Sequence, residues 1–158
     1  YRSMAHGDTL EVPVELQEAT CPYVVERVQL RQDSGGAGTH RGGLGVQKSY
    51  RLRQDCSVYI HFERTKCPPW GLEGGGEGRT GYVEIHGADG RVRTVLKEIT
   101  KAQSGDRIDV HTAGGGGFGP PGGRSVEAIA RDLQEAYVSP EAAIEAYGDR
   151  ARRALQTD

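Results

Sequence analysis

The sequence has few apolar side chains for its length. Hydrophobic residues make up 35% of 158 residues, aromatic residues make up 6%, and the mean hydropathy is -0.60. A chain of this length ordinarily forms one domain with a substantial core. We therefore expect one domain whose surface is completed by a partner. No apolar run approaches the roughly 20 residues of a membrane-spanning helix, which argues against a membrane partner.

A strong charge of either sign is also lacking. The 20 basic and 22 acidic residues give a net charge of -2, so no global field attracts nucleic acid or an anionic membrane. The three cysteines are an odd number and few for a secreted disulfide scaffold. Residues 1–8 lack the apolar core of a signal peptide. We expect a cytoplasmic protein without a nucleic-acid partner.

Glycine, in contrast, is abundant, with 24 residues gathered mainly in three clusters, 33–45, 74–76 and 114–123. In the first cluster, glycine occupies six of thirteen positions. Such a run does not form a helix or strand interior, because each glycine adds backbone entropy and offers no side chain to bury. We interpret it as a tight loop that presents main-chain amides and a few polar groups.

The third cluster matches the dinucleotide-binding pattern G-x-G-x-x-G by letter, from Gly117 to Gly122. Pro120 and Pro121, however, occupy the place where a helix N-terminus should offer free N–H groups to a pyrophosphate. The phosphate-binding loop pattern also fails, because Arg124 stands where lysine is required. We therefore reject an independent nucleotide site and interpret these glycines as backbone that packs closely against another chain.

Alternating apolar residues predict a series of short strands. They cover residues 10–16, 23–31, 46–53, 58–62, 83–85, 92–99 and 108–110. Pro13 cannot donate to a strand ladder, so the first strand is expected at a sheet edge. Short strands about ten residues apart, separated by glycine-rich turns, favour a sandwich or barrel over a parallel sheet. We predict a mainly β domain over residues 1–124.

The pattern changes after Arg124. Ser125 can cap a helix whose apolar residues, from Val126 to Tyr137, form one continuous stripe. The run Ser139-Pro140-Glu141 supplies a cap, a proline and an acid for the start of a second helix, which Gly148 can interrupt. We predict a helical extension of two helices over residues 125–158, packed on the β domain or on a partner.

Four residues could form a tetrahedral zinc site, namely Cys56, His61 and Cys67 with Cys21 as the fourth. No C-x-x-C pair is present, so these ligands would have to meet through the fold. Buried cysteines without a ligand are the default expectation, and the zinc site is the alternative to it. Cys21 and Cys67 each precede a proline, an extended setting that suits a ligand loop.

Several motifs in order resemble one family. They are Asp33 to Gly38, Arg41 to Gly45, Pro68 to Leu72 with Gly74-Gly75, and Gly114 to Gly119, followed by Arg124, Asp132 and Ser139-Pro140. From about Glu11 to Gly148 the sequence is similar to the hydantoinase B/5-oxoprolinase family. The resemblance implies a multisubunit ATP-dependent enzyme that needs no biotin. It also implies that ATP and Mg are bound by an A-type ATPase partner subunit.

The similarity covers only the C-terminal part of the large B-type subunit, without the part that carries the family's His/Asp metal motif. It implies a small subunit that completes a large B-type subunit in an ATP-dependent ketone carboxylase of the acetophenone type. The alternatives are a subunit of an ATP-dependent cyclic-amide hydrolase and a structural, zinc-bearing assembly module. The cysteines depart from the family pattern, which favours zinc and leaves a late-forming disulfide as another alternative.

Three polar residues in or near the loops are candidates for lining a site shared with the partner. They are Asp33, Arg41 and Arg64. An arginine can clamp a phosphate or carboxylate group, whereas a solvated surface charge is the ordinary alternative for such a residue.

Overall fold

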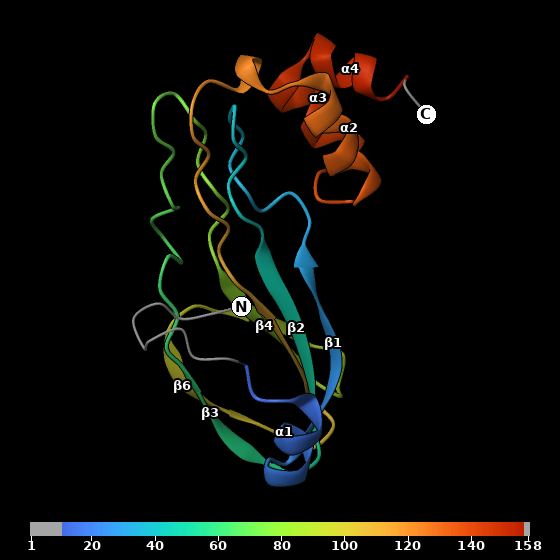
Figure 1. Ribbon diagram of the computed structural model, residues 1–158. Helices are drawn as coiled ribbons and strands as arrows, with labels where there is room; N and C mark the ends of the chain where they lie inside the picture. Colours follow the sequence, from blue (N-terminus) through green and yellow to red (C-terminus); the bar gives the residue numbers. More distant parts are fainter. Residues whose placement is uncertain (1–10, 157–158) are drawn as a thin grey trace.

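The computed structural model describes residues 11–156, which form a β sandwich, a middle region of extended glycine-rich segments and a helical cap (Figure 1). The helices and strands follow one another as α1 (Val14–Thr20), β1 (Tyr23–Arg31), β2 (Gly45–Leu52), β3 (Cys56–Ile60), β4 (Tyr82–His86), β5 (Val92–Val95), β6 (Glu98–Ala102), β7 (Arg107–His111), the 3-10 turn η2 (Pro121–Gly123), α2 (Val126–Gln134), α3 (Pro140–Tyr147) and α4 (Asp149–Ala154). No helix within residues 11–156 combines the length and the apolar character needed to cross a bilayer.

The sandwich has two antiparallel layers. Five strands are ordered β1-β2-β7-β4-β5, and β3 pairs with β6 in a second, smaller sheet. The core lies between the layers and is built from one face of the strands β2 to β7, as a period of two requires. Its buried residues are Leu52, Ile60, Val83, Ile85, Val95, Ala102 and Ile108. The predicted mainly β fold is confirmed, and of the sandwich and the barrel that the sequence pattern favoured, the two separate sheets form the sandwich.

The register of β4 against β7 separates an apolar face from a polar face. Val83 lies opposite Val110 and points into the sandwich, whereas Glu84 lies opposite Asp109 and points away from it. Successive side chains of a strand alternate between faces, so polar residues two positions apart gather on the outer face. The sequence pattern of these strands therefore sets both the core and a polar outer surface.

Between the sandwich and the helices, three segments run side by side as extended threads (Figure 1). We call residues 34–45, 70–79 and 113–119 the glycine bundle. Main-chain hydrogen bonds connect the segments: Gly36 N donates to Gly115 O at 2.8 Å, Gly76 N to Ala37 O at 2.7 Å, and Gly117 N to Gly76 O at 2.9 Å.

The spacing in the glycine bundle leaves no room for side chains at the contacts. A Cβ atom on Gly114 would lie 1.7 Å from Ser34 O, and one on Gly117 would lie 2.0 Å from Ala37 O. Only glycine lets two backbones approach this closely. The predicted close-packed backbone is confirmed, but it packs against other segments of the same chain rather than against another chain.

The helical cap follows the glycine bundle. The Ser125 and Ser139 hydroxyls cap α2 and α3 by accepting hydrogen bonds from Ala128 N and Ala142 N, each at 3.2 Å, as predicted. Gly148, with φ at 56°, ends α3 and separates it from α4. The second predicted helix is therefore two helices. The helices α2, α3 and α4 together bury a separate apolar cluster composed of Ile129, Val138, Ala143, Tyr147, Ala151 and Ala154.

Two predicted strands are wrong. The segment 14–20 is helix α1, with Leu16 54% exposed, and Leu10 lies outside the described residues. Pro13 stands before the first turn, where its missing N–H has no cost. The predicted strand 92–99 is also wrong, because the chain turns after Val95 and its two halves join different sheets as β5 and β6.

Candidate functional site

A cleft of about 550 Å³ lies between the glycine bundle and the helical cap. Asp33 and Arg41, two of the three candidates from the sequence, line it together with Arg79 and Tyr147. The structure thus brings these two residues to one cavity. The contacts of each show what its polar groups already do there.

Arg41 belongs to an ion-pair network around Asp132, whose side chain on α2 is only 6% exposed. Arg41 Nε donates to Asp132 Oδ1 at 3.3 Å, and Arg124 Nη2 lies 2.7 Å from Asp132 Oδ2. The Arg41 guanidinium also lies over the Tyr137 ring, 5.3 Å from its centroid. A buried carboxylate between two arginines holds α2 against the glycine bundle, because separating the charges would leave them buried and unpaired.

Asp33 connects the end of β1 to the turn between α2 and α3. Its amide donates to Tyr137 O at 3.1 Å, and its Oδ1 accepts from Ser139 N at 2.7 Å. The residue has φ at 58°, a left-handed conformation that aspartate tolerates better than most residues. Asp33 therefore docks the helical cap through contacts separate from the Asp132 network.

Arg64 does not reach this cleft. Its guanidinium lies over the ring of Trp70, 4.7 Å from the centroid, and its carbonyl accepts from Gly81 N at 3.0 Å. It lines a separate surface hollow with Cys67 and Lys97. The three candidates from the sequence are therefore divided between two places.

The four predicted zinc ligands are not brought together. Cys21 and Cys56 line an apolar pocket of about 370 Å³ beside Tyr23, which His61 and Cys67 do not line. All three cysteines are free thiols. His61 also lies one residue beyond β3 instead of within it. Burial raises the pKa of the Cys56 thiol, and the neighbouring Asp55 carboxylate raises it further.

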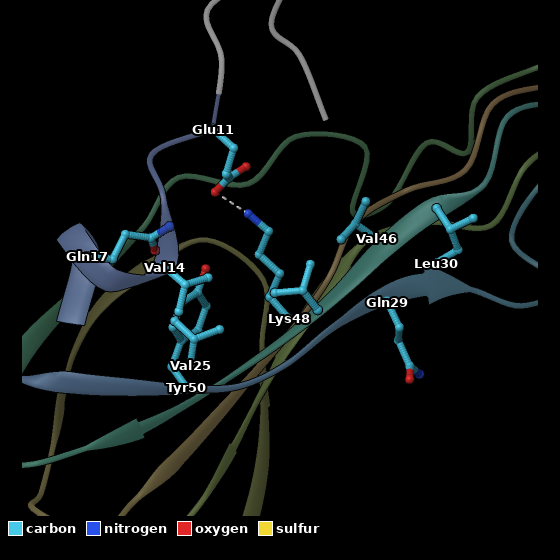
Figure 2. Close-up of a pocket in the computed structure, with 10 residues that line it drawn as sticks. Glu11, Val14, Gln17, Val25, Gln29, Leu30, Val46, Lys48 and Tyr50 are labelled. Atoms are coloured by element: carbon cyan, nitrogen blue, oxygen red, sulfur yellow. Dashed lines mark hydrogen bonds and ion pairs between the residues drawn. The ribbon is translucent and has the colours of Figure 1, made fainter.

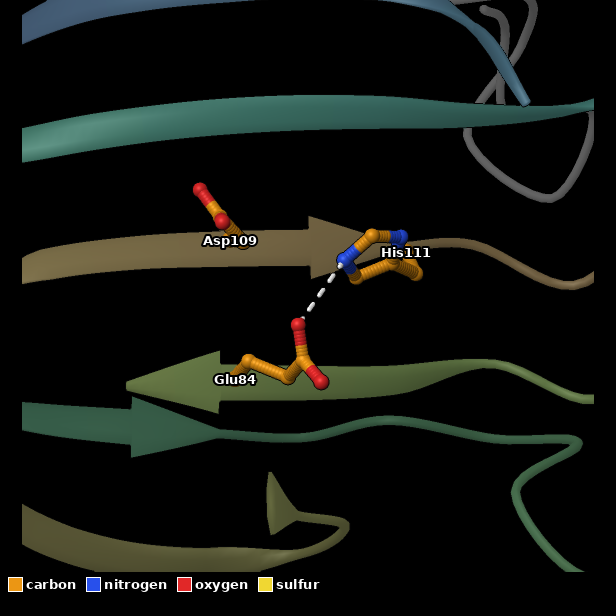
Figure 3. A group of neighbouring side chains, drawn as sticks. All are labelled: Glu84, Asp109 and His111. Atoms are coloured by element: carbon orange, nitrogen blue, oxygen red, sulfur yellow. Dashed lines mark ion pairs between the residues drawn. The ribbon is translucent and has the colours of Figure 1, made fainter. Parts of the chain in front are cut away.

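A different group of metal-ligating side chains lies on the polar outer face of the five-stranded sheet (Figure 3). Potential ligand atoms of Glu84, Asp109 and His111 all lie within 4.8 Å of one another. Within residues 11–156 this is the one group of three or more such side chains that is so close. His86 on β4 adds a second imidazole beside it.

The sequence contains a signal for this group that is separate from the predicted cysteine site. Glu84-Ile85-His86 and Asp109-Val110-His111 each place an acid and a histidine two positions apart. On a strand this spacing puts both side chains on one face. Only the pairing of β4 with β7 brings the two segments together, and sequence spacing does not reveal that pairing.

The surroundings of His111 hold its ring in place. Tyr82 stacks on it with ring centroids 4.4 Å apart, and the Arg31 guanidinium lies 5.0 Å from the Tyr82 centroid. Arg31 Nη1 in turn donates to Thr80 O at 2.7 Å. Burial lowers the pKa of His111, against the opposing pull of the Glu84 carboxylate.

A further hollow, of about 430 Å³, lies between α1 and the paired strands β1 and β2 (Figure 2). Val28 and Leu30 line it and are 56% and 50% exposed, although they lie on the face of β1 that continues the sandwich core. Lys48 crosses the hollow to form an ion pair with Glu11. The small β3–β6 sheet thus leaves part of the apolar face uncovered within the described chain.

These features define a class of protein module in which an antiparallel β sandwich is joined to a helical cap through a glycine bundle. The chain belongs to the hydantoinase B/oxoprolinase family, whose model matches residues 3–121. The family predicted from the order of the motifs is confirmed.

The chain is also similar to individual proteins. The chain is 34% identical to an uncharacterized protein of Methanocaldococcus jannaschii, over 87% of this chain and 24% of the relative. It is 29% identical to the B-type subunit of a putative D-/L-hydantoinase from Pseudomonas sp., over 90% of this chain and 25% of that protein. Nucleotide-free acetone carboxylase has the same fold, with a TM-score of 0.77 at 20% identity, covering 94% of this chain and 26% of that one. The chain therefore spans about a quarter of the length of these relatives.

Proposed function

We propose that this chain is part of the B-type component of an ATP-dependent multisubunit enzyme, and that it completes that component instead of catalysing alone. Its proposed partners are the large hydantoinase B-type subunit and an A-type ATPase subunit that binds ATP and Mg. The proposed enzyme does not use biotin. The family membership and the partial coverage of the relatives support it.

The observation that carries the proposal is that main-chain amides of the glycine bundle are already hydrogen-bonded within the chain. In the glycine bundle, Gly36 N, Gly76 N and Gly117 N donate to carbonyls of neighbouring segments and are not free to bind an anion. A phosphate-binding loop needs several convergent free N–H groups. The glycine-rich loops are thus suited to building a rigid scaffold, and we assign nucleotide binding to the partner.

Two reactions are proposed for the assembled enzyme. The first is the biotin-independent carboxylation of a ketone of the acetophenone type, for which the acetone carboxylase likeness supplies the fold alone. The second is the hydrolysis of a cyclic amide, which the name of the hydantoinase relative favours. In both reactions the ATPase subunit is proposed to use ATP to activate an oxygen atom of the substrate or of bicarbonate. A structural assembly module without a role in turnover is the third alternative.

The test rebuilds the complex from this chain and the purified large B-type and A-type proteins. Turnover of ATP is measured with bicarbonate plus acetophenone and, separately, with hydantoin. We expect turnover only when all components are present, and product analysis then distinguishes carboxylation from ring opening. Full turnover without this chain would contradict the proposal, as would turnover by this chain alone.

Asp33 and Arg41 remain the residues proposed to line a site shared with the large subunit, and Arg64 is proposed to lie at a separate contact. Arg41→Ala is compared in the rebuilt complex with Arg131→Ala, which removes an exposed arginine from the same helical cap. Lower turnover in an intact complex carrying Arg41→Ala supports a shared site. Unchanged assembly and unchanged turnover would remove Arg41 from the mechanism.

A further inference from the structure

Three buried polar atoms on the outer face of the sheet lack a hydrogen-bond partner. They are His86 Nε2, Asp109 Oδ1 and His111 Nε2. Asp109 is only 5% exposed and His111 only 8% exposed, so solvent reaches neither side chain freely. Buried polar atoms are almost always paired, and an unpaired one calls for an explanation such as a bound ion. All three atoms belong to one cluster on β4 and β7, and a single explanation can serve all of them.

Three distances within the cluster are near the spacing of ligands around one metal ion, and candidate ligand atoms of Glu84, Asp109 and His111 all lie within 4.8 Å of one another. Glu84 Oε2 lies 3.6 Å from His111 Nε2 and 3.6 Å from His86 Nε2, and His86 Nε2 lies 3.1 Å from Asp109 Oδ2. Tetrahedral ligands with bonds of about 2.0 to 2.1 Å lie about 3.3 to 3.4 Å from one another. The imidazole nitrogens approach the carboxylates this closely without forming a hydrogen bond to them.

An ordinary ion-pair network accounts for only part of this arrangement. Arg107 Nε and Nη2 both lie 3.1 Å from Asp109 Oδ2, so this carboxylate oxygen has a cationic partner. Asp109 Oδ1 remains buried without a partner. A protonated His86 would also attract both carboxylates, but an N–H donor should align with one of them, and His86 Nε2 does not.

From these contacts we propose that Glu84, Asp109 and His111 bind a divalent transition-metal ion, with His86 as the fourth protein donor. A set of carboxylate and imidazole ligands suits Zn²⁺, whereas Mg²⁺ and Ca²⁺ prefer oxygen ligands alone. The ion binds through Glu84 Oε2, Asp109 Oδ1 and the Nε2 atom of His111. This site replaces the predicted set of Cys21, Cys56, His61 and Cys67 as the metal centre of the described chain.

The sheet positions the ligand side chains before an ion binds. Glu84 lies directly opposite Asp109 in the antiparallel ladder, and each histidine lies two positions along its own strand. Tyr82 stacks on the His111 ring and Arg107 holds Asp109, so both side chains are oriented without an ion. The Glu84 and His86 side chains are 31% and 26% exposed, which lets an ion enter from the outer face.

The experiment measures Zn²⁺ binding by the full 158-residue chain, stripped of metal with a chelator and then titrated with Zn²⁺ alone. Bound metal is counted by mass spectrometry after the excess is removed. We expect about one Zn²⁺ per chain, and an affinity at least tenfold lower in Glu84→Gln and His111→Gln. Glu135→Gln, which alters an exposed carboxylate on the helical cap, is the matched control and should bind as the wild type does.

Binding of no Zn²⁺ by the folded wild-type chain would overturn the proposal, as would unchanged binding in Glu84→Gln and His111→Gln. If these variants do not fold, ring-nitrogen NMR signals of the wild-type histidines decide. Shifts of His86 and His111 on addition of Zn²⁺ support the site, whereas shifts of His61 alone, or of no histidine, overturn it. The readout is bound metal, so the result is independent of the proposed enzyme activity.

Discussion

The β sandwich and the glycine bundle are both tightly packed, but by opposite means. In the sandwich, large side chains fill the space between two sheets, and Val83 and Ile85 are each 2% exposed. In the glycine bundle, main chains touch directly, and a Cβ on Gly114 would lie 1.7 Å from a carbonyl oxygen. The difference teaches that stability depends on the largest residues in one region and on the smallest in the other.

The largest expected effect is in the glycine bundle. Gly114→Ala adds one carbon where a backbone atom already stands, so the segments must separate and their hydrogen bonds lengthen. We expect a loss of about 4 kcal/mol in the free energy of unfolding, within the upper range for overpacking and strain. Urea denaturation measures it. Gly43→Ala is the control, because a Cβ there meets no atom within 4 Å. Equal stability of the two variants would contradict packing of main chain against main chain.

A slightly smaller effect is expected in the sandwich. Ile85→Ala removes a fully buried side chain between the sheets and leaves a cavity, which costs about 3 kcal/mol. Ile99→Ala on β6 removes the same atoms from a residue that is 65% exposed and should change stability far less. The same denaturation measurement compares the pair. If Ile85→Ala were as mild as Ile99→Ala, side-chain packing would not be what stabilises the sandwich.

The third largest effect on stability is expected at the junction between the glycine bundle and the helical cap. Asp132→Asn leaves Arg41 and Arg124 beside a neutral amide, with side chains 15% and 12% exposed. Removing one partner of a buried ion network costs about 3 kcal/mol or somewhat less here, since the amide still accepts hydrogen bonds. Hydrogen exchange should show that α2 and α3 open before the sandwich does. The control is Asp149→Asn, whose ion pair with Arg152 is solvent-exposed.

The smallest effect concerns the thiols beside the sandwich. The thiolate is the reactive form, and the raised pKa of Cys56 lowers its thiolate fraction at a given pH. Iodoacetamide should therefore label exposed Cys67 before Cys56 at a pH of about 7.5, and the rate at Cys56 should continue to rise above a pH of about 9. Mass spectrometry of the labelled peptides follows both thiols. Labelling of Cys56 as fast as Cys67 near neutral pH would contradict the partial burial and the raised pKa of Cys56.

Much of the fold could be predicted because its signals are local. Period-two alternation marked β1, β2, β4 and β7, and Ser125 and Ser139 marked the starts of α2 and α3. The wrong prediction of a first strand also has a local cause. Residues 10–16 alternate like a strand, but no strand of the described chain pairs with residues 11–16. After Pro13 the helix α1 is the conformation that satisfies the main-chain amides.

The candidate sites were harder to predict because they depend on pairing across the sheet or between distant segments. Asp33 and Arg41 do line one cleft, yet Arg64 lies elsewhere, and Cys67 does not reach the pocket of Cys56. Glu84 and His111 are 27 positions apart in the chain, and only the register of β4 against β7 makes them neighbours.

The sequence by itself determined the family, the β-rich class and the need for close-packed backbone. The order of the motifs along the chain indicates the family, whereas alternation and glycine content are local preferences that indicate strands and close-packed backbone. The tertiary structure alone decided what the glycines pack against, where Arg41 finds its buried carboxylate, and which acids and histidines meet. These contacts join residues tens of positions apart, so their energies depend on the closed fold and not on local preference.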